Sequence, residues 1–135
     1  MMAHYDALVA AIHDAGKETR IGVLLPVPPA ATQDAFGANY ANGQTRWQYR
    51  RNQHRLVERM LSHYSSREAG GVDIVATHLN LDCRRNYPAE RGKANAEAEI
   101  EIERQSNGVH PAAAGYRQIG DTLYAWLTAT RRSRR

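Results

Sequence analysis

At residues 21–25 the chain reads Ile21-Gly22-Val23-Leu24-Leu25, an uninterrupted apolar run that is closed by Pro26, Pro28 and Pro29. Such a run is typical of a strand that is buried on both faces, as strands of a parallel sheet are. Proline has no N–H to donate to a strand ladder, so the three prolines predict an extended segment directly after the strand.

A second strand is predicted at residues 72–77, which read Val72-Asp73-Ile74-Val75-Ala76-Thr77 after the breaker Gly70-Gly71. Between the two runs, residues 45–65 show the spacing of a long helix. Its expected inner stripe consists of Tyr49, Gln53, Leu56, Val57, Met60, Leu61 and Tyr64. A strand, a helix of about 20 residues and a strand form a crossover unit with parallel strands. The fold class is therefore expected to be α/β.

The remaining segments are assigned in the same way. Residues 3–15 repeat apolar side chains at helical spacing, and residues 30–43 are rich in Ala, Gly, Asn and Thr and are expected to form an irregular loop. In residues 89–105 Glu alternates with Ala and Ile, which favours an exposed extended or hairpin segment over a helix.

A histidine precedes the last predicted helix, in the stretch Ser106-Asn107-Gly108-Val109-His110-Pro111-Ala112-Ala113-Ala114-Gly115-Tyr116-Arg117-Gln118-Ile119. Pro111 suits the first helical position, which places His110 at or beside the N-cap. The apolar residues of this helix predict a stripe that faces a core: Tyr116, Ile119, Leu123, Trp126 and Leu127. An imidazole held in such a loop can accept and release protons near neutral pH.

The stretch from Asn107 to Pro111, with Ala114-Gly115-Tyr116 after it, resembles the last sequence block of the SGNH (GDSL-type) hydrolases. That block reads Asp-x-x-His-Pro, so Asn107 stands in the place of the family's aspartate. The two predicted strands are similar to a mid-sheet strand and to the last strand of that fold. The resemblance implies the C-terminal half of a flavodoxin-like, three-layer α/β/α domain with a parallel sheet. Residues 1–130 would then be one incomplete domain and residues 131–135 a basic, disordered tail.

The resemblance also implies a function. His110 would be the general base of an ester hydrolase that acts on an acylated lipid or carbohydrate, with Asn107 orienting its ring. The family's nucleophilic serine lies in a Gly-Asp-Ser block, and no Gly-Asp-Ser occurs in this chain. The chain alone is therefore expected to be inactive, and its partner would be the missing N-terminal half or a second copy. No cofactor and no metal are implied.

Two alternatives remain open for the residues around His110. Asp82 follows the second strand and is a second candidate to orient the ring. Cys83, which Arg84 and Arg85 follow, could form a Cys-His-Asn set with His110 and Asn107, because nearby positive charge lowers the pKa of a thiol. An unreactive loop cysteine is the favoured interpretation.

Composition limits the remaining function classes. The net charge of +4 comes entirely from four arginines in residues 131–135, so nucleic-acid binding through this tail and the arginine-rich helix is the less favoured reading. No apolar run is long enough to span a membrane and no signal peptide is recognised, so a cytoplasmic location is the default expectation. No two histidines have the i, i+4 spacing of a zinc pair. A non-catalytic remnant, or a module that binds a saccharide or a protein partner, is the main alternative to the hydrolase.

Overall fold

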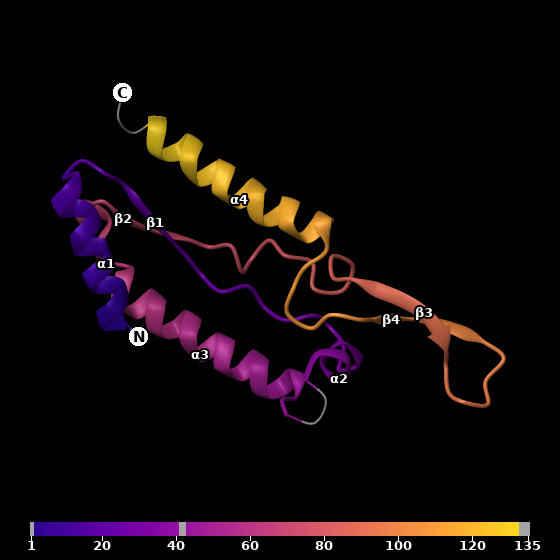
Figure 1. Cartoon of the computed structure of the whole chain (residues 1–135). Coiled ribbons are helices and arrows are strands. Elements are labelled where there is room, and N and C mark those ends of the chain that lie inside the picture. Colours follow the sequence, from indigo (N-terminus) through magenta and orange to yellow (C-terminus); the bar gives the residue numbers. More distant parts are fainter. Residues whose placement is uncertain (1, 41–42, 133–135) are drawn as a thin grey trace.

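The computed structural model describes residues 2–40 and 43–132 of the chain. Figure 1 shows its elements, whose bounds are α1 (Met2–Ala15), β1 (Ile21–Leu24), α2 (Asp34–Tyr40), α3 (Arg46–Tyr64), β2 (Val72–Val75), β3 (Ala89–Lys93), β4 (Glu101–Gln105) and α4 (Ala113–Arg132). A short 3-10 turn (Glu68–Gly70) precedes β2, and Gly71 adopts a φ of 80° that glycine tolerates. None of the described helices has both the length and the apolar character needed to cross a membrane.

The strand–helix–strand unit is confirmed. β1 and β2 pair in parallel with Ile21 opposite Val72 and Leu24 opposite Val75, and α3 is the connection between them. In Figure 1, α1 and α3 lie on one side of this sheet and α4 lies on the other. The chain is therefore α/β, with a small parallel sheet between helical layers.

The main core lies between the sheet and α3. Its buried side chains come from both strands and from one stripe of the helix, and they are Val23, Leu25, Val57, Met60, Tyr64 and Val72. Alternate strand residues point to opposite faces, so Gly22 and Asp73 face α4 instead. A Cβ on Gly22 would lie 2.9 Å from the ring of Trp126, so the glycine allows the indole to approach the sheet closely. Trp126 Nε1 donates a hydrogen bond to Asp73 Oδ2 at 3.0 Å.

The structure corrects the expectation of an irregular loop at residues 30–43, because α2 forms there. The helix places Phe36 in a second buried cluster together with Ala30, Ala35, Leu81 and Tyr87. The seven residues of α2 contain few large apolar side chains, so the sequence shows no clear helical spacing there. The helix is stabilised by the burial of Phe36 rather than by its own helical propensity. The favoured hairpin is confirmed: β3 and β4 pair in antiparallel fashion and project from the body of the molecule (Figure 1).

α4 differs from its prediction at both ends and along its face. It begins at Ala113 rather than at Pro111, and it continues to Arg132, so the first two residues of the expected tail are helical. Of the predicted core stripe, Tyr116 is 53% exposed and Leu127 is 49% exposed. Two strands span only about 10 Å, roughly the diameter of one helix, so a sheet this narrow covers only part of the stripe.

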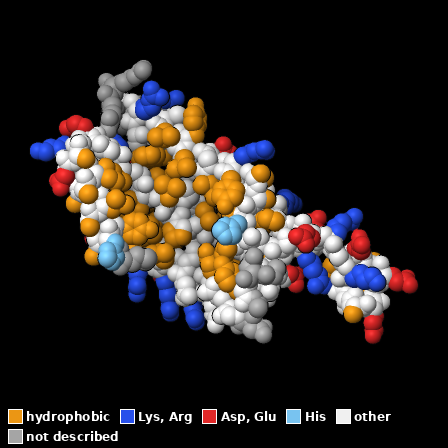
Figure 2. Space-filling view, in the orientation of Figure 1, with side chains coloured by type: hydrophobic (Ala, Val, Ile, Leu, Met, Phe, Trp, Pro, Cys, Tyr) orange, Lys and Arg blue, Asp and Glu red, His pale blue; other side chains and the backbone are white. Residues whose placement is uncertain are grey.

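One edge of β1 carries no neighbouring strand within the described residues. The N–H groups of Ile21 and Leu25 donate to Gly71 and Val75 on the β2 side, at 2.8 and 3.1 Å. Backbone groups alternate in direction along a strand, so those of Gly22 and Leu24 point to the open edge. Figure 2 shows hydrophobic side chains gathered on the face that contains β1 and the adjoining helices. Leu24, the last residue of β1, is 43% exposed.

Candidate functional site

The loop that carries His110 is fixed at the carboxyl end of the parallel strands. Gly108 C=O accepts the N–H of Ala30, which lies beyond β1, and Ala112 N–H donates to Asn86 C=O, which lies beyond β2, at 3.0 and 2.9 Å. A Cβ on Gly108 would lie 2.9 Å from the Phe36 ring, so glycine lets the loop rest directly on that ring. Ligand sites of open α/β sheets form at this end of the strands.

His110 itself is exposed at the surface of this loop. Only its backbone N–H has a hydrogen-bond partner within residues 2–40 and 43–132. The imidazole is thus accessible to a substrate. The structure places His110 at the expected end of the sheet, and none of the described residues offers a hydroxyl or thiol that is hydrogen-bonded to its ring.

Asn107 supports the loop rather than the ring. Its Oδ1 accepts the backbone N–H groups of Val109 and His110, at 3.1 and 2.9 Å. This is the local turn that Asn side chains commonly form with the backbone two and three residues further on. The amide oxygen that was expected to orient the imidazole is therefore used to fix the backbone on which the imidazole stands.

Asp82 has a similar structural role. Its Oδ1 accepts the N–H groups of Arg84 and Arg85 at 2.9 and 3.1 Å, and these two bonds lower the pKa of its carboxyl group. Gln118 of α4 holds the same loop, because its Oε1 accepts the N–H of Asp82 at 2.9 Å. A carboxylate bonded in this way stabilises the turn after β2.

Cys83 lies partly buried against the second core cluster, and its thiol donates to Leu81 C=O at 3.5 Å. Burial raises the pKa of this thiol, which is the opposite direction to that expected from the neighbouring arginines. Arg46 and Arg50, and not Arg84 or Arg85, supply the positive charge that partly offsets this rise. A protonated thiol packed against apolar side chains is a poor nucleophile.

Sequence reasoning missed Gln105, a buried side chain that joins the loops at this end of the sheet. Its Oε1 accepts the N–H of Thr32, and its Nε2 donates to the C=O groups of Cys83 and Arg84 at 2.8 and 3.0 Å. Beside it lies a cavity of about 430 Å³, which is lined by Ala31, Thr32, Arg84, Glu103 and Gln105. No sequence signal distinguishes Gln105 from an exposed hairpin residue, because only the approach of three distant segments buries it.

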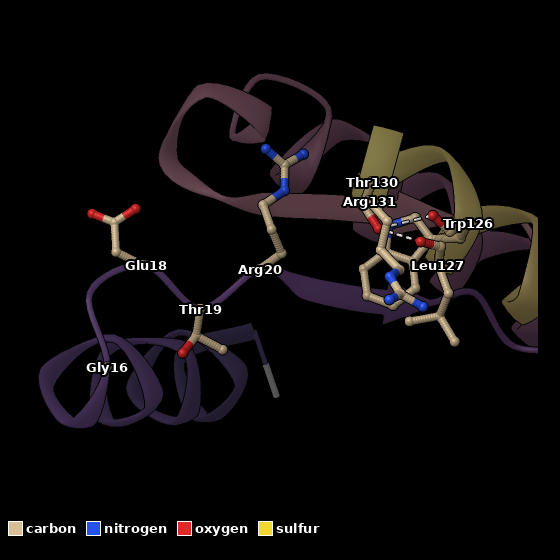
Figure 3. Close-up of a pocket in the computed structure, with 8 residues that line it drawn as sticks. All are labelled: Gly16, Glu18, Thr19, Arg20, Trp126, Leu127, Thr130 and Arg131. Atoms are coloured by element: carbon tan, nitrogen blue, oxygen red, sulfur yellow. Dashed lines mark hydrogen bonds between the residues drawn. The ribbon is translucent and has the colours of Figure 1, made fainter. Parts of the chain in front are cut away.

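A second hollow, of about 420 Å³, lies between the segment after α1 and the end of α4 (Figure 3). Its Arg20 side chain is already engaged, since it forms an ion pair with Asp73. This hollow lies beside the segment that leads into β1, at the opposite end of the strand from the His110 loop. Within the described part of the chain, no group of three or more His, Cys, Asp and Glu side chains could hold a metal ion.

Comparison of the chain with known protein families, with curated proteins and with solved structures finds no match.

Proposed function

We propose that this chain is the base-supplying part of an ester hydrolase of the SGNH type. The observation that carries the proposal is the position of His110: an exposed imidazole on a rigid loop at the carboxyl end of a parallel strand pair. The resemblance of residues 107–116 to the last SGNH block supports the same conclusion. The finer fold proposed with it is the C-terminal half of a flavodoxin-like domain.

In this proposal the attacking hydroxyl and the oxyanion donors come from a second polypeptide segment. No strand of the described residues pairs with the outer edge of β1, so that edge offers backbone groups to which further parallel strands could add. His110 would remove the proton of the attacking hydroxyl while the hydroxyl oxygen adds to the ester carbonyl. It would then give that proton to the departing alcohol. No cofactor takes part. The substrate class is an acylated lipid or carbohydrate.

Asn107 limits the rate of such a site. In the serine-protease triad, replacing Asp by Asn lowers the rate about 10⁴-fold, because a neutral amide does not stabilise the imidazolium. Here the amide oxygen is also engaged by the loop backbone. A slow esterase is therefore expected even when the nucleophilic segment is present.

The experiment combines this chain with a separately produced N-terminal segment of an SGNH hydrolase that carries the Gly-Asp-Ser block. Hydrolysis of p-nitrophenyl acetate is expected in the mixture and not with either part alone. It should be lost with His110→Ala, retained with His4→Ala on α1, and blocked by a serine-directed phosphonate. Phosphonate-sensitive turnover by this chain alone would refute the claim that the site is incomplete.

A second candidate function is a non-catalytic module. It is favoured by the use of Asn107 as a backbone cap and by the raised pKa of Cys83. If the mixture above forms a stable complex without any turnover that depends on His110, this second function is the correct one.

A further inference from the structure

One face of α3 combines an exposed indole with arginines. The residues of this Trp47 face are Trp47, Arg50, Arg51 and His54, which line a shallow hollow of about 300 Å³. Trp47 is 68% exposed, so most of its side chain faces solvent and not the core. The buried stripe of the same helix is on another side and contains Val57, Met60 and Tyr64.

The first turn of α3 holds Trp47 in a defined place. Thr45 and Gln48 form a reciprocal capping box at the start of the helix, with bonds of 3.2 and 2.8 Å. Arg46 is anchored as well, because its Nε donates to Ala30 C=O at 2.8 Å while its guanidinium lies 5.1 Å from the centre of the indole. An aromatic ring on a capped helix and beside an anchored cation is a preorganised surface.

Positive charge far exceeds negative charge on α3. α3 contains five arginines and a single acidic residue, Glu58, which pairs with His54 at 3.4 Å. Among the described residues no carboxylate lies within ion-pair distance of Arg50 or Arg51. Figure 2 shows Lys and Arg side chains projecting from the margin along which α3 lies. The Arg50 guanidinium lies over the Trp47 ring, 5.9 Å from its centre, and a guanidinium in that position can still donate its N–H groups to an anionic ligand.

We propose that the Trp47 face binds single-stranded nucleic acid. A base would stack on the Trp47 ring, and the phosphates on either side of it would contact Arg50 and Arg51. Stacking on an aromatic side chain beside cationic groups is the usual way in which proteins hold unpaired bases. This activity is separate from ester hydrolysis, since its residues lie on α3 and none belongs to the His110 loop.

Two other polyanions fit less well. The bases of a duplex are stacked on each other and offer no free face to an indole. An anionic membrane prefers a helix with a broad apolar face, whereas the apolar stripe of α3 is buried in the core and Trp47 is the only large apolar side chain on the Trp47 face.

The test uses the full chain and a fluorescein-labelled oligothymidine of about 12 nucleotides, a length within the usual range of such sites. Fluorescence anisotropy is recorded over a series of salt concentrations. Trp47→Ala is expected to weaken binding about tenfold through loss of one stacked base. Arg50→Gln with Arg51→Gln is expected to lower the slope of log K against log salt by about 1.4, the contribution of two phosphates on a single strand.

The matched control is Arg91→Gln with Arg117→Gln, which removes the same charge from exposed positions on β3 and α4. It should leave the affinity within a factor of about two. Equal weakening by both double variants would show attraction by net charge alone and would overturn the proposal. Binding to vesicles of phosphatidylserine and phosphatidylcholine that requires Trp47, without oligothymidine binding, would also overturn it. Circular dichroism confirms that each variant is folded.

Discussion

Asn107 Oδ1 lies 2.9 Å from the backbone nitrogen of His110 and accepts its N–H. The residue expected to orient the imidazole therefore fixes the backbone that carries the imidazole. The backbone at His110 is thus fixed by a neutral amide, and no described residue is hydrogen-bonded to the imidazole itself. Together with the bonds of Gly108 and Ala112 to the segments beyond β1 and β2, this turn fixes the backbone of residues 107–112.

Asn107→Ala is expected to lower the free energy of unfolding by about 1 kcal/mol, because the N–H groups of Val109 and His110 lose their acceptor. Urea unfolding followed by circular dichroism measures this change. Asn107→Asp keeps an acceptor oxygen in the same place and serves as the control, with a loss well below that of the alanine variant. Equal losses would mean that the cap does not stabilise the loop.

Gly115→Ala is expected to be destabilising by about 1–3 kcal/mol. The new Cβ would lie 2.6 Å from Asn86 C=O and 2.7 Å from Pro111 Cβ, so the start of α4 must move away from the loop after β2. Gly120→Ala on the same helix has nothing within 4 Å and should stabilise the protein by about 0.5–1 kcal/mol through helix propensity. Thermal or urea unfolding of the pair measures the contrast. If both substitutions stabilise, the close packing of Gly115 is wrong.

The open edge of β1 predicts self-association at high protein concentration. The strand carries no charge or proline within residues 21–24 to discourage edge pairing, and Leu24 adds exposed apolar surface beside it. Leu24→Lys should lower the average mass measured by multi-angle light scattering. Leu79→Lys changes a leucine in the loop after β2 that is more exposed than Leu24, at 72% against 43%, and should leave the mass unchanged. A monomeric mass at all concentrations would show that the β1 edge does not pair with a second copy of the chain.

His78 predicts a loss of stability in mild acid. Its Nδ1 is buried and has no hydrogen-bond partner among the described atoms, and burial, with a smaller effect of His54, lowers the pKa of this histidine. The neutral form is therefore favoured in the folded protein. Stability is retained above the unfolded pKa of about 6.5 and is lost as pH falls through the lower folded pKa.

Urea unfolding measured between about pH 7.5 and about pH 5 tests whether the free energy of unfolding falls as the pH is lowered. His78→Gln should flatten the dependence of the unfolding free energy on pH, whereas His4→Gln, at an exposed position of α1, should leave it as it was. A steeper decline in the His78 variant would contradict the assignment.

Several parts of this fold could be predicted from local pattern alone. A continuous apolar run predicted β1, the Val- and Ile-containing segment after Gly70-Gly71 predicted β2, helical spacing predicted α1 and α3, and alternation favoured the hairpin of β3 and β4. These predictions succeed because the spacing of apolar residues within each segment is enough to indicate whether it is a helix or a strand. The position of His110 beyond the strands followed from the same topology.

What only the tertiary structure decided depends on segments that are distant in sequence. α2 forms because the ring of Phe36 is buried against Leu81 and Tyr87, and Gln105 is buried because two loops close over it. The direction of the Cys83 pKa shift follows from its burial among these segments, which a residue type does not specify. The Asn107 turn is an exception, because its partners Val109 and His110 are local in sequence. The apolar period of α4 determined that it is a helix, but the width of the sheet beneath it decided how much of that stripe is covered.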